Sequence, residues 1–276
     1  MTTSSDLLSR ESHFAFGKNW ASYAKLVTQA QIDEAVAGLR KLLGGGDLQG
    51  KRFLDIGCGS GLHSLAALRL GAAEVLAVDL DRDSVATTRH MLETHAAGHK
   101  WRVLEKSVFD LDPADLGQFD LVYSWGVLHH TGDMYRALRC AAAMLAPGGD
   151  FVFALYRHTR LCWFWKLEKR WYAHAGQRGQ SLAQSLYIAV FRLLCYPRGK
   201  DFHALVANYR TANRGMDFRH DVHDWLGGWP YESIAPRQTE RFMHELGLRH
   251  VRSFALQKTS LGLLGSGCDE YVYGRR

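Results

Sequence analysis

The chain has 276 residues, of which 47% are apolar, so it can bury a substantial core as one domain with an insertion. Its formal net charge of +6 comes from scattered Lys and Arg residues with no long basic run, which argues against a nucleic-acid partner. The five cysteines contain no C-x-x-C pair, and neither a signal-peptide pattern nor a membrane-spanning apolar stretch is found, so we expect a cytoplasmic protein without structural zinc.

The order of predicted elements indicates an α/β fold. A helix over 29–43 ends in three successive glycines, which stop it. Short apolar segments then alternate with amphipathic ones. We expect strands near Arg52, Glu74, Trp101, Asp120 and Asp150, with helices near Leu62, Ser84 and Tyr135. This alternation predicts a Rossmann-like doubly wound, mostly parallel sheet covered by helices on both faces.

The alternation is interrupted after residue 157. Residues 158–232 hold five of the eight tryptophans and two predicted helices, over 161–174 and 181–195. A helix over 236–246 and strands from Arg249 and Asp269 then complete the pattern. We therefore expect an N-terminal helical lid segment (1–50), a cofactor-binding core (51–157), a helical cap inserted after the fifth strand (158–232), and a C-terminal part that completes the core (233–276).

A glycine-rich turn is the most informative motif. Residues 53–61 read FLDIGCGSG, a short apolar strand that runs into Gly57, Gly59 and Gly61 ahead of a helix. Glycines at such a turn allow positive φ angles and close approach of a ligand to backbone N–H groups. Asp79 follows 22 residues after Gly57, at the end of the next strand, where a carboxylate can accept both hydrogens of a ribose diol. The turn predicts a nucleoside cofactor.

The residues of the turn also discriminate between cofactors. The third glycine comes one residue earlier than in the dinucleotide fingerprint, and Asp55 precedes the first glycine by two. A carboxylate there would repel a pyrophosphate but could hold an ammonium group. An amino-acid-bearing nucleoside is therefore favoured. A dinucleotide-dependent oxidoreductase and a non-catalytic cofactor-binding protein stay open as alternatives.

On these motifs the chain resembles the class I S-adenosylmethionine-dependent methyltransferases. The resemblance spans residues 51–156 and includes LDIGCGSG, the Val78-Asp79 pair, FDLVYSWGVLHH at 119–130 and LAPGG at 145–149. Three further segments are similar to methyltransferases of the ubiquinone pathway and of polysaccharide clusters: FGKNW at 16–20, DWLGGWPYE at 224–232 and GCDEYVYGR at 267–275.

The resemblance implies a binding site for S-adenosylmethionine and its product S-adenosylhomocysteine. Asp55 and the three glycines would line the methionine portion, and Asp79 would hold the ribose. Ser107 stands where an acid is usual, so adenine N6 would meet Asp110 or a main-chain carbonyl instead. The remaining implied cofactor contacts are Leu80, Val108, Ser124 and Trp125.

The cap and the lid are the predicted acceptor side, because an insertion after the fifth strand would cover the cofactor edge of the sheet. We expect substrate contacts from Trp20, Trp163, Asp224 and Tyr231. The alternative interpretation of Trp163 and its neighbours is a satellite apolar core. A third is peripheral membrane contact, because basic residues lie beside the tryptophans.

The predicted reaction is methyl transfer to a small molecule by in-line displacement, with a hydroxyl as the favoured acceptor. His130 is the expected general base and His129 the second candidate, although a lone histidine is often structural. N- or C-methylation of a small molecule is the alternative. No N/D-P-P-Y/F or Pro-Cys arrangement, typical of DNA and protein methylation, follows the fourth strand. We predict no required metal, and the oligomeric state is left open.

Overall fold

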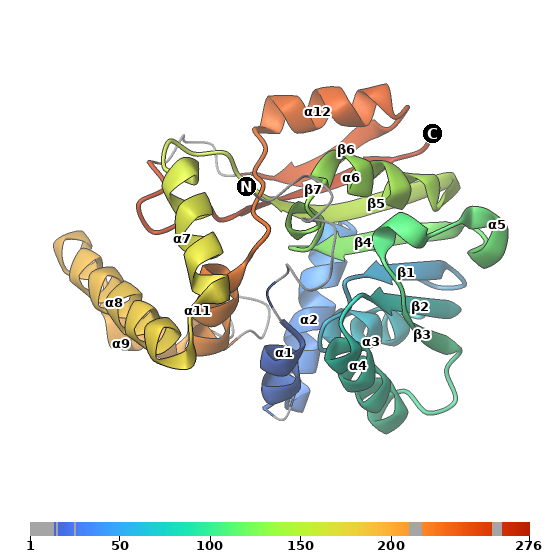
Figure 1. Ribbon diagram of the computed structural model, residues 1–276. Coiled ribbons are helices and arrows are strands. Elements are labelled where there is room, and N and C mark those ends of the chain that lie inside the picture. The colour runs from blue at the N-terminus through green and yellow to red at the C-terminus, as the bar shows by residue number, and fades with distance from the viewer. Residues whose placement is uncertain (1–13, 15, 25, 210–216, 256–260) are drawn as a thin grey trace.

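The computed structural model describes residues 14, 16–24, 26–209, 217–255 and 261–276 (Figure 1). Residues 1–13, on which the expectation of no signal peptide depends, lie outside the described residues. Within the described part, none of the helices combines the length and the apolar content that crossing a bilayer requires.

One seven-stranded sheet forms the centre of the molecule, in the order β3-β2-β1-β4-β5-β7-β6. The first five strands pair in parallel, and β7 pairs antiparallel with both β5 and β6. The strands are β1 (Arg52–Ile56), β2 (Glu74–Asp79), β3 (Trp101–Glu105), β4 (Phe119–Trp125), β5 (Leu145–Tyr156), β6 (Arg249–Phe254) and β7 (Cys268–Gly274). The expected Rossmann-like, mostly parallel sheet is confirmed. The strand order reverses between β1 and β4, which opens a crevice at their carboxyl ends.

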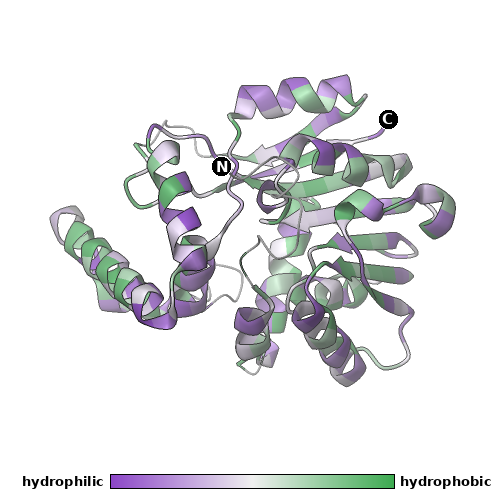
Figure 2. Ribbon diagram, viewed as in Figure 1, coloured by the Kyte–Doolittle hydropathy of each residue, from purple (hydrophilic) through white to green (hydrophobic). Residues whose placement is uncertain are grey.

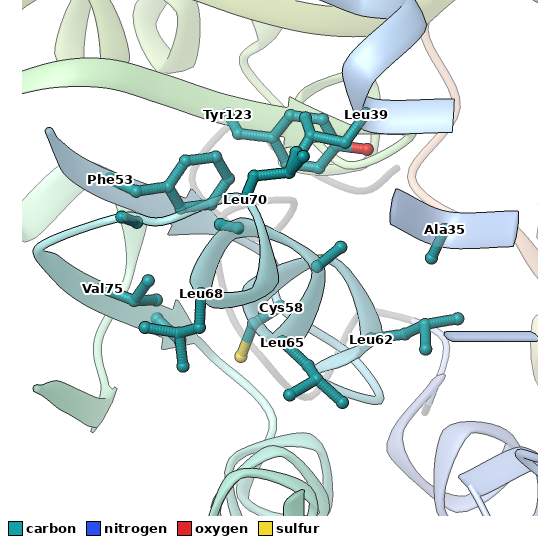
Figure 3. Packing of buried hydrophobic residues seen from close by; sticks show 14 of the residues in the cluster. Ala35, Leu39, Phe53, Cys58, Leu62, Leu65, Leu68, Leu70, Val75 and Tyr123 are labelled. Atoms are coloured by element: carbon teal, nitrogen blue, oxygen red, sulfur yellow. The ribbon is translucent and has the colours of Figure 1, made fainter. Parts of the chain in front are cut away.

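Helices cover both faces of the sheet because alternate strand residues point to opposite sides. Phe53 and Val75 pack with α2 (Gln29–Leu42), α3 (Leu62–Arg69) and α4 (Arg82–His95) in one apolar cluster, part of which Figure 3 shows. Leu54 and Leu76 pack with α6 (Met134–Ala143) and α12 (Pro236–Glu245) in a second. The short α5 (Pro113–Leu116) precedes β4.

A helical cap stands to one side of the sheet (Figure 1). It contains α7 (Cys162–His174), α8 (Gln177–Cys195), the 3-10 turn η5 (Tyr196–Arg198), α9 (Phe202–Ala207) and α11 (Phe218–Gly227). The sequence-based start of the second cap helix was four residues late. In the structure Gly176 is the N-cap of α8, and the helix continues past Gly179. Glycine has a low helix propensity, so these two residues led to a prediction of a later start. The cap has its own apolar cluster, which includes Trp165, Tyr172 and Phe218.

The remaining described elements lie at or near the crevice. They are α1 (Phe16–Ala24), which contacts both α4 and α11, and the 3-10 turns η3 (Val108–Asp110) and η4 (Leu128–His130). Helix α1 therefore links the core to the cap at the position where the sequence predicted a lid segment.

A buried ion pair holds the exit of β5 against β7. Arg157 and Asp269 are 4% and 1% exposed, and Arg157 Nε donates to an Asp269 carboxylate oxygen at 2.8 Å. We expect Asp269→Asn to lower the free energy of unfolding by about 3 to 5 kcal/mol, because the guanidinium loses its buried counter-charge. Asp150, paired with Arg276 at the exposed end of the same strands, provides the control. Asp150→Asn should cost less than about 1 kcal/mol in urea denaturation, and equal losses would contradict the assignment.

Candidate active site

The glycine turn between β1 and α3 adopts a backbone that only glycine fits without strain. Gly57, Gly59 and Gly61 have φ angles of 76°, 54° and 78°. A Cβ atom at Gly57 would lie 2.4 Å from the Val127 side chain, and one at Gly59 would lie 3.2 Å from the Trp20 indole. A Cβ at Gly61 would lie 2.9 Å from the backbone of α4. The turn thus has no side chains at these three positions because neighbouring residues pack closely against its backbone.

Two buried carboxylates flank this turn. Asp55 accepts a hydrogen bond from Ser64 Oγ at 2.6 Å, and burial raises its pKa to about 7. Asp79 accepts from the backbone N–H groups of Gly59 at 3.0 Å and of Asp81 at 2.9 Å. Burial also raises the Asp79 pKa, to about 6. Each carboxyl group can therefore lose its proton when a bound ligand places a hydrogen-bond donor or a cation beside it.

One cavity of about 880 Å³ extends from the turn to the cap. Its volume lies within the range of ligand-binding clefts. Its turn-side wall holds most of the residues that the resemblance implied: Asp55, Gly57, Gly59, Asp79, Leu80, Ser107, Val108 and Trp125. Trp125 is fixed there, because its Nε1 donates to Glu270 at 2.8 Å.

Two residues predicted for the cofactor lie behind that wall. Ser124 is fully buried and donates to the Ile56 carbonyl at 3.0 Å, so it joins β4 to β1 and does not border the cavity. Gly61 is not part of the lining, and its contact is with Thr88 of α4. Asp110, suggested for the adenine edge, also lies outside the lining, whereas Asp81 and Lys106 are part of it.

The acceptor-side wall differs from expectation. Trp163 is 64% exposed on the outside of α7, and Tyr231 is buried in the cap cluster with its hydroxyl on Cys162 Sγ at 3.2 Å. Neither lines the cavity, so their predicted substrate contacts have no support there. The lining comes from residues that the sequence analysis missed: Tyr156, Tyr187, Phe191, Tyr209, Phe218 and Trp225. The four-residue spacing of Tyr187 and Phe191 was the available signal, but it cannot tell which helix face turns inward.

Trp20 and Asp224, by contrast, both line the cavity. Asn19 Nδ2 donates to Asp224 at 2.7 Å and to the His220 carbonyl at 3.1 Å, which ties α1 to α11. Burial raises the pKa of Asp224 well above its usual value. Helix α1 thus borders one side of the cavity and is joined to a carboxyl group of the cap by a hydrogen bond.

The two candidate bases differ in their surroundings. His130 lines the cavity, and its Nδ1 lies 2.7 Å from the Pro230 carbonyl oxygen. A carbonyl can only accept, so Nδ1 carries the hydrogen and the lone pair of the neutral ring is on Nε2. His129 is fully buried outside the lining, and burial lowers its pKa well below the usual value. Of the two histidines, only His130 borders the cavity.

Comparison with known proteins supports a single family. Residues 28–248 match the family model described as "Methyltransferase domain". The chain is 40% identical over 113 residues to the ubiquinone biosynthesis O-methyltransferase of Xanthomonas campestris. The matched stretch covers 41% of this chain and 46% of that protein. The corresponding enzyme of Bordetella avium is 37% identical over 110 residues, or 40% and 44% of the two chains. The chain thus matches less than half the length of these relatives.

A solved structure shows the same fold. Magnesium protoporphyrin IX methyltransferase from Synechocystis, with bound S-adenosylhomocysteine, superposes with a TM-score of 0.51 at 15% identity. The match covers 90% of this chain and 83% of that one.

The raised pKa of Asp55 makes ligand binding depend on pH. An acid whose folded pKa is about 7 is largely protonated near pH 5.5 and must lose its proton to hold an ammonium group. We expect the affinity for S-adenosylhomocysteine to fall as the pH drops below about 7, by up to roughly tenfold per pH unit for one proton. Titration calorimetry between about pH 5.5 and 7.5 measures this.

Asp55→Asn should bind more weakly near neutral pH and show a flatter profile. Asp115→Asn, at an exposed carboxyl outside the lining, should keep the profile of the unmodified protein. Equal affinity of the unmodified protein at both pH values would refute the assigned role of Asp55.

Proposed function

The chain belongs to the methyltransferase domain family, and from this premise we propose that it transfers a methyl group from S-adenosylmethionine to a hydroxyl group of a small molecule. One observation carries the proposal: a single cavity joins the glycine turn and its two carboxylates to an aromatic wall that contains His130. The relatives that match part of this chain are named O-methyltransferases, and this supports a hydroxyl acceptor.

The turn-side residues fit the methyl donor by charge and by space. Asp55 would hold its ammonium group, Asp79 its ribose hydroxyls, and Leu80 and Val108 would lie against adenine. Glycines allow the backbone of the turn to approach a ligand closely, and a Cβ at Gly57 would clash with the Val127 side chain. When bound, the donor supplies a methyl group on a positively charged sulfur.

The acceptor wall would contribute mainly orientation and dryness. Displacement at a methyl group needs donor and acceptor in line, and a rigid aromatic wall restricts how a small molecule can lie. Tyr156 is nine-tenths buried, and its ring meets the Trp225 ring edge to face with the centroids 4.9 Å apart, so the two rings of this wall support each other. Exclusion of water strengthens the electrostatic interactions inside the cavity.

His130 would accept the hydroxyl proton. Its tautomer is set by the Pro230 carbonyl, which orients the ring and leaves Nε2 in the basic form. Asp224 is a poor alternative base, because its buried carboxyl favours the protonated form. It would serve better as a hydrogen-bond partner that keeps α1 in place.

A direct experiment tests the function. The protein is incubated with S-adenosylmethionine carrying an isotopically labelled methyl group and with a small-molecule extract, and products are identified by mass spectrometry. We expect one class of small molecule to gain the label, on oxygen. Asp79→Asn should abolish the gain by weakening donor binding. Tight binding of NAD without binding of S-adenosylhomocysteine, or the absence of any labelled product, would overturn the proposal.

The base role of His130 has a separate test. We expect His130→Ala to lower kcat by about 10²- to 10⁴-fold with little change in the KM for S-adenosylmethionine, because proton acceptance is lost while donor binding is kept.

His99→Ala, at an exposed histidine outside the cavity, is the matched control and should behave as the unmodified protein. Full activity of His130→Ala would remove this residue from the mechanism.

A further inference from the structure

The outward faces of α7 and α8 expose large apolar side chains. Nine of the thirteen exposed large apolar residues in the described part of the chain lie between 163 and 196. We call this set the outer cap surface: Trp163, Phe164, Leu167, Trp171, Leu182, Leu186, Val190, Leu193 and Tyr196. Single exposed apolar residues are ordinary, but a concentration on two consecutive helices marks a contact surface.

Helix α8 is apolar on two opposite faces. Its inner face packs into the cap cluster through residues such as Tyr187 and Phe191. Its outer face places Leu182, Leu186 and Leu193 at 70%, 64% and 71% exposure. Figure 2 shows the predominantly apolar colouring of this helix, which lies at the edge of the molecule farthest from the sheet. A surface helix needs one apolar face to pack on its own domain, so the second apolar face of α8 is available to contact a partner.

Helix α7 extends the same surface. Trp163, Leu167 and Trp171 follow one another at four-residue spacing and are 64%, 61% and 54% exposed. The Trp171 ring lies 3.7 Å from the position of a Cβ atom at Gly179, near the start of α8. The apolar stripes of the two helices therefore meet at this point.

The charges around the outer cap surface have one sign. Between residues 158 and 200 the only acid is Glu168. Both of its carboxylate oxygens are buried, without a hydrogen-bond partner among the described residues, and burial raises its pKa to about 7. The exposed charged residues of this stretch are all basic: Arg160, Lys166, Arg170, Arg178, Arg192 and Lys200.

This combination distinguishes between occupants. In a symmetric dimer built on this surface the same basic residues would face each other, and the like charges would repel. A bilayer that contains anionic lipids offers an apolar layer beneath a negatively charged surface, which complements both features.

We propose that the outer cap surface docks on an anionic phospholipid bilayer, with its apolar side chains in the interfacial layer and its basic side chains among the headgroups. This goes beyond the proposed methyl transfer and does not depend on it. Because Tyr187 and Phe191 on the inner face of α8 line the cavity, docking would hold the cavity one helix away from the lipid.

Co-sedimentation of the full chain with vesicles tests the proposal. Vesicles of phosphatidylcholine with and without phosphatidylglycerol are compared. We expect the protein to bind the anionic vesicles and to be released by salt. The triple variant Leu182→Ser, Leu186→Ser, Leu193→Ser should lose at least about tenfold in partitioning, and so should Lys166→Gln, Arg178→Gln, Arg192→Gln.

Matched control variants test whether vesicle binding depends on this surface or on nonspecific apolar and electrostatic attraction by the rest of the protein. Leu26→Ser with Tyr135→Ser removes exposed apolar side chains elsewhere, and Arg237→Gln, Arg241→Gln, Arg249→Gln removes three exposed charges elsewhere. Both should bind as the unmodified protein does. S-adenosylhomocysteine affinity, measured in every variant, shows whether the cavity is intact, and so separates failure of docking from failure of the proposed function.

Three results would overturn the proposal. The first is sedimentation of the unmodified protein that does not increase when anionic vesicles are added. The second is an equal loss of binding in the control variants. The third is a dimer in sedimentation velocity that the triple serine variant dissociates, without lipid binding, since a second copy of the chain would then be the occupant.

Discussion

The hydrogen bond from the Gly59 amide to the Asp79 carboxylate is the contact on which the arrangement of the site depends. It joins the turn after β1 to the end of β2, so two adjacent parallel strands present their carboxyl ends in a fixed relation. Gly59 has a φ of 54°, a left-handed conformation that glycine adopts without strain. The Trp20 indole lies against the same glycine, so helix α1 contacts the turn.

The buried carboxylates show where stability is given up for binding. Asp55 and Asp79 have raised pKa values because burial disfavours their charged forms. A folded acid of this kind favours folding at low pH, and this advantage is lost as the pH rises through its folded pKa. A ligand that brings a cation or hydroxyl donors relieves that penalty. The site is therefore more favourable with its ligand than without it.

The cap performs two tasks with one set of helices. Its inner side supplies aromatic residues to the cavity, and α11 binds α1 through the hydrogen bond from Asn19 to Asp224. Its outer side remains apolar and basic. Both tasks follow from the separation of the cap from the sheet, because helices that do not pack on the sheet can use two faces.

The sequence by itself determined the α/β class, the alternation of strands and helices in the core and most of the turn-side wall of the cavity. These are local: a strand, three glycines and an acid at the end of the next strand carry their meaning through backbone geometry and spacing. The tertiary structure decided what depends on packing between distant segments. It turned Trp163 outward and Tyr187 inward, placed Ser124 behind the wall, and separated His130 from His129 through the Pro230 carbonyl. Neighbouring residues of one motif point in different directions, and which of them meets the cavity is set by elements a hundred residues away.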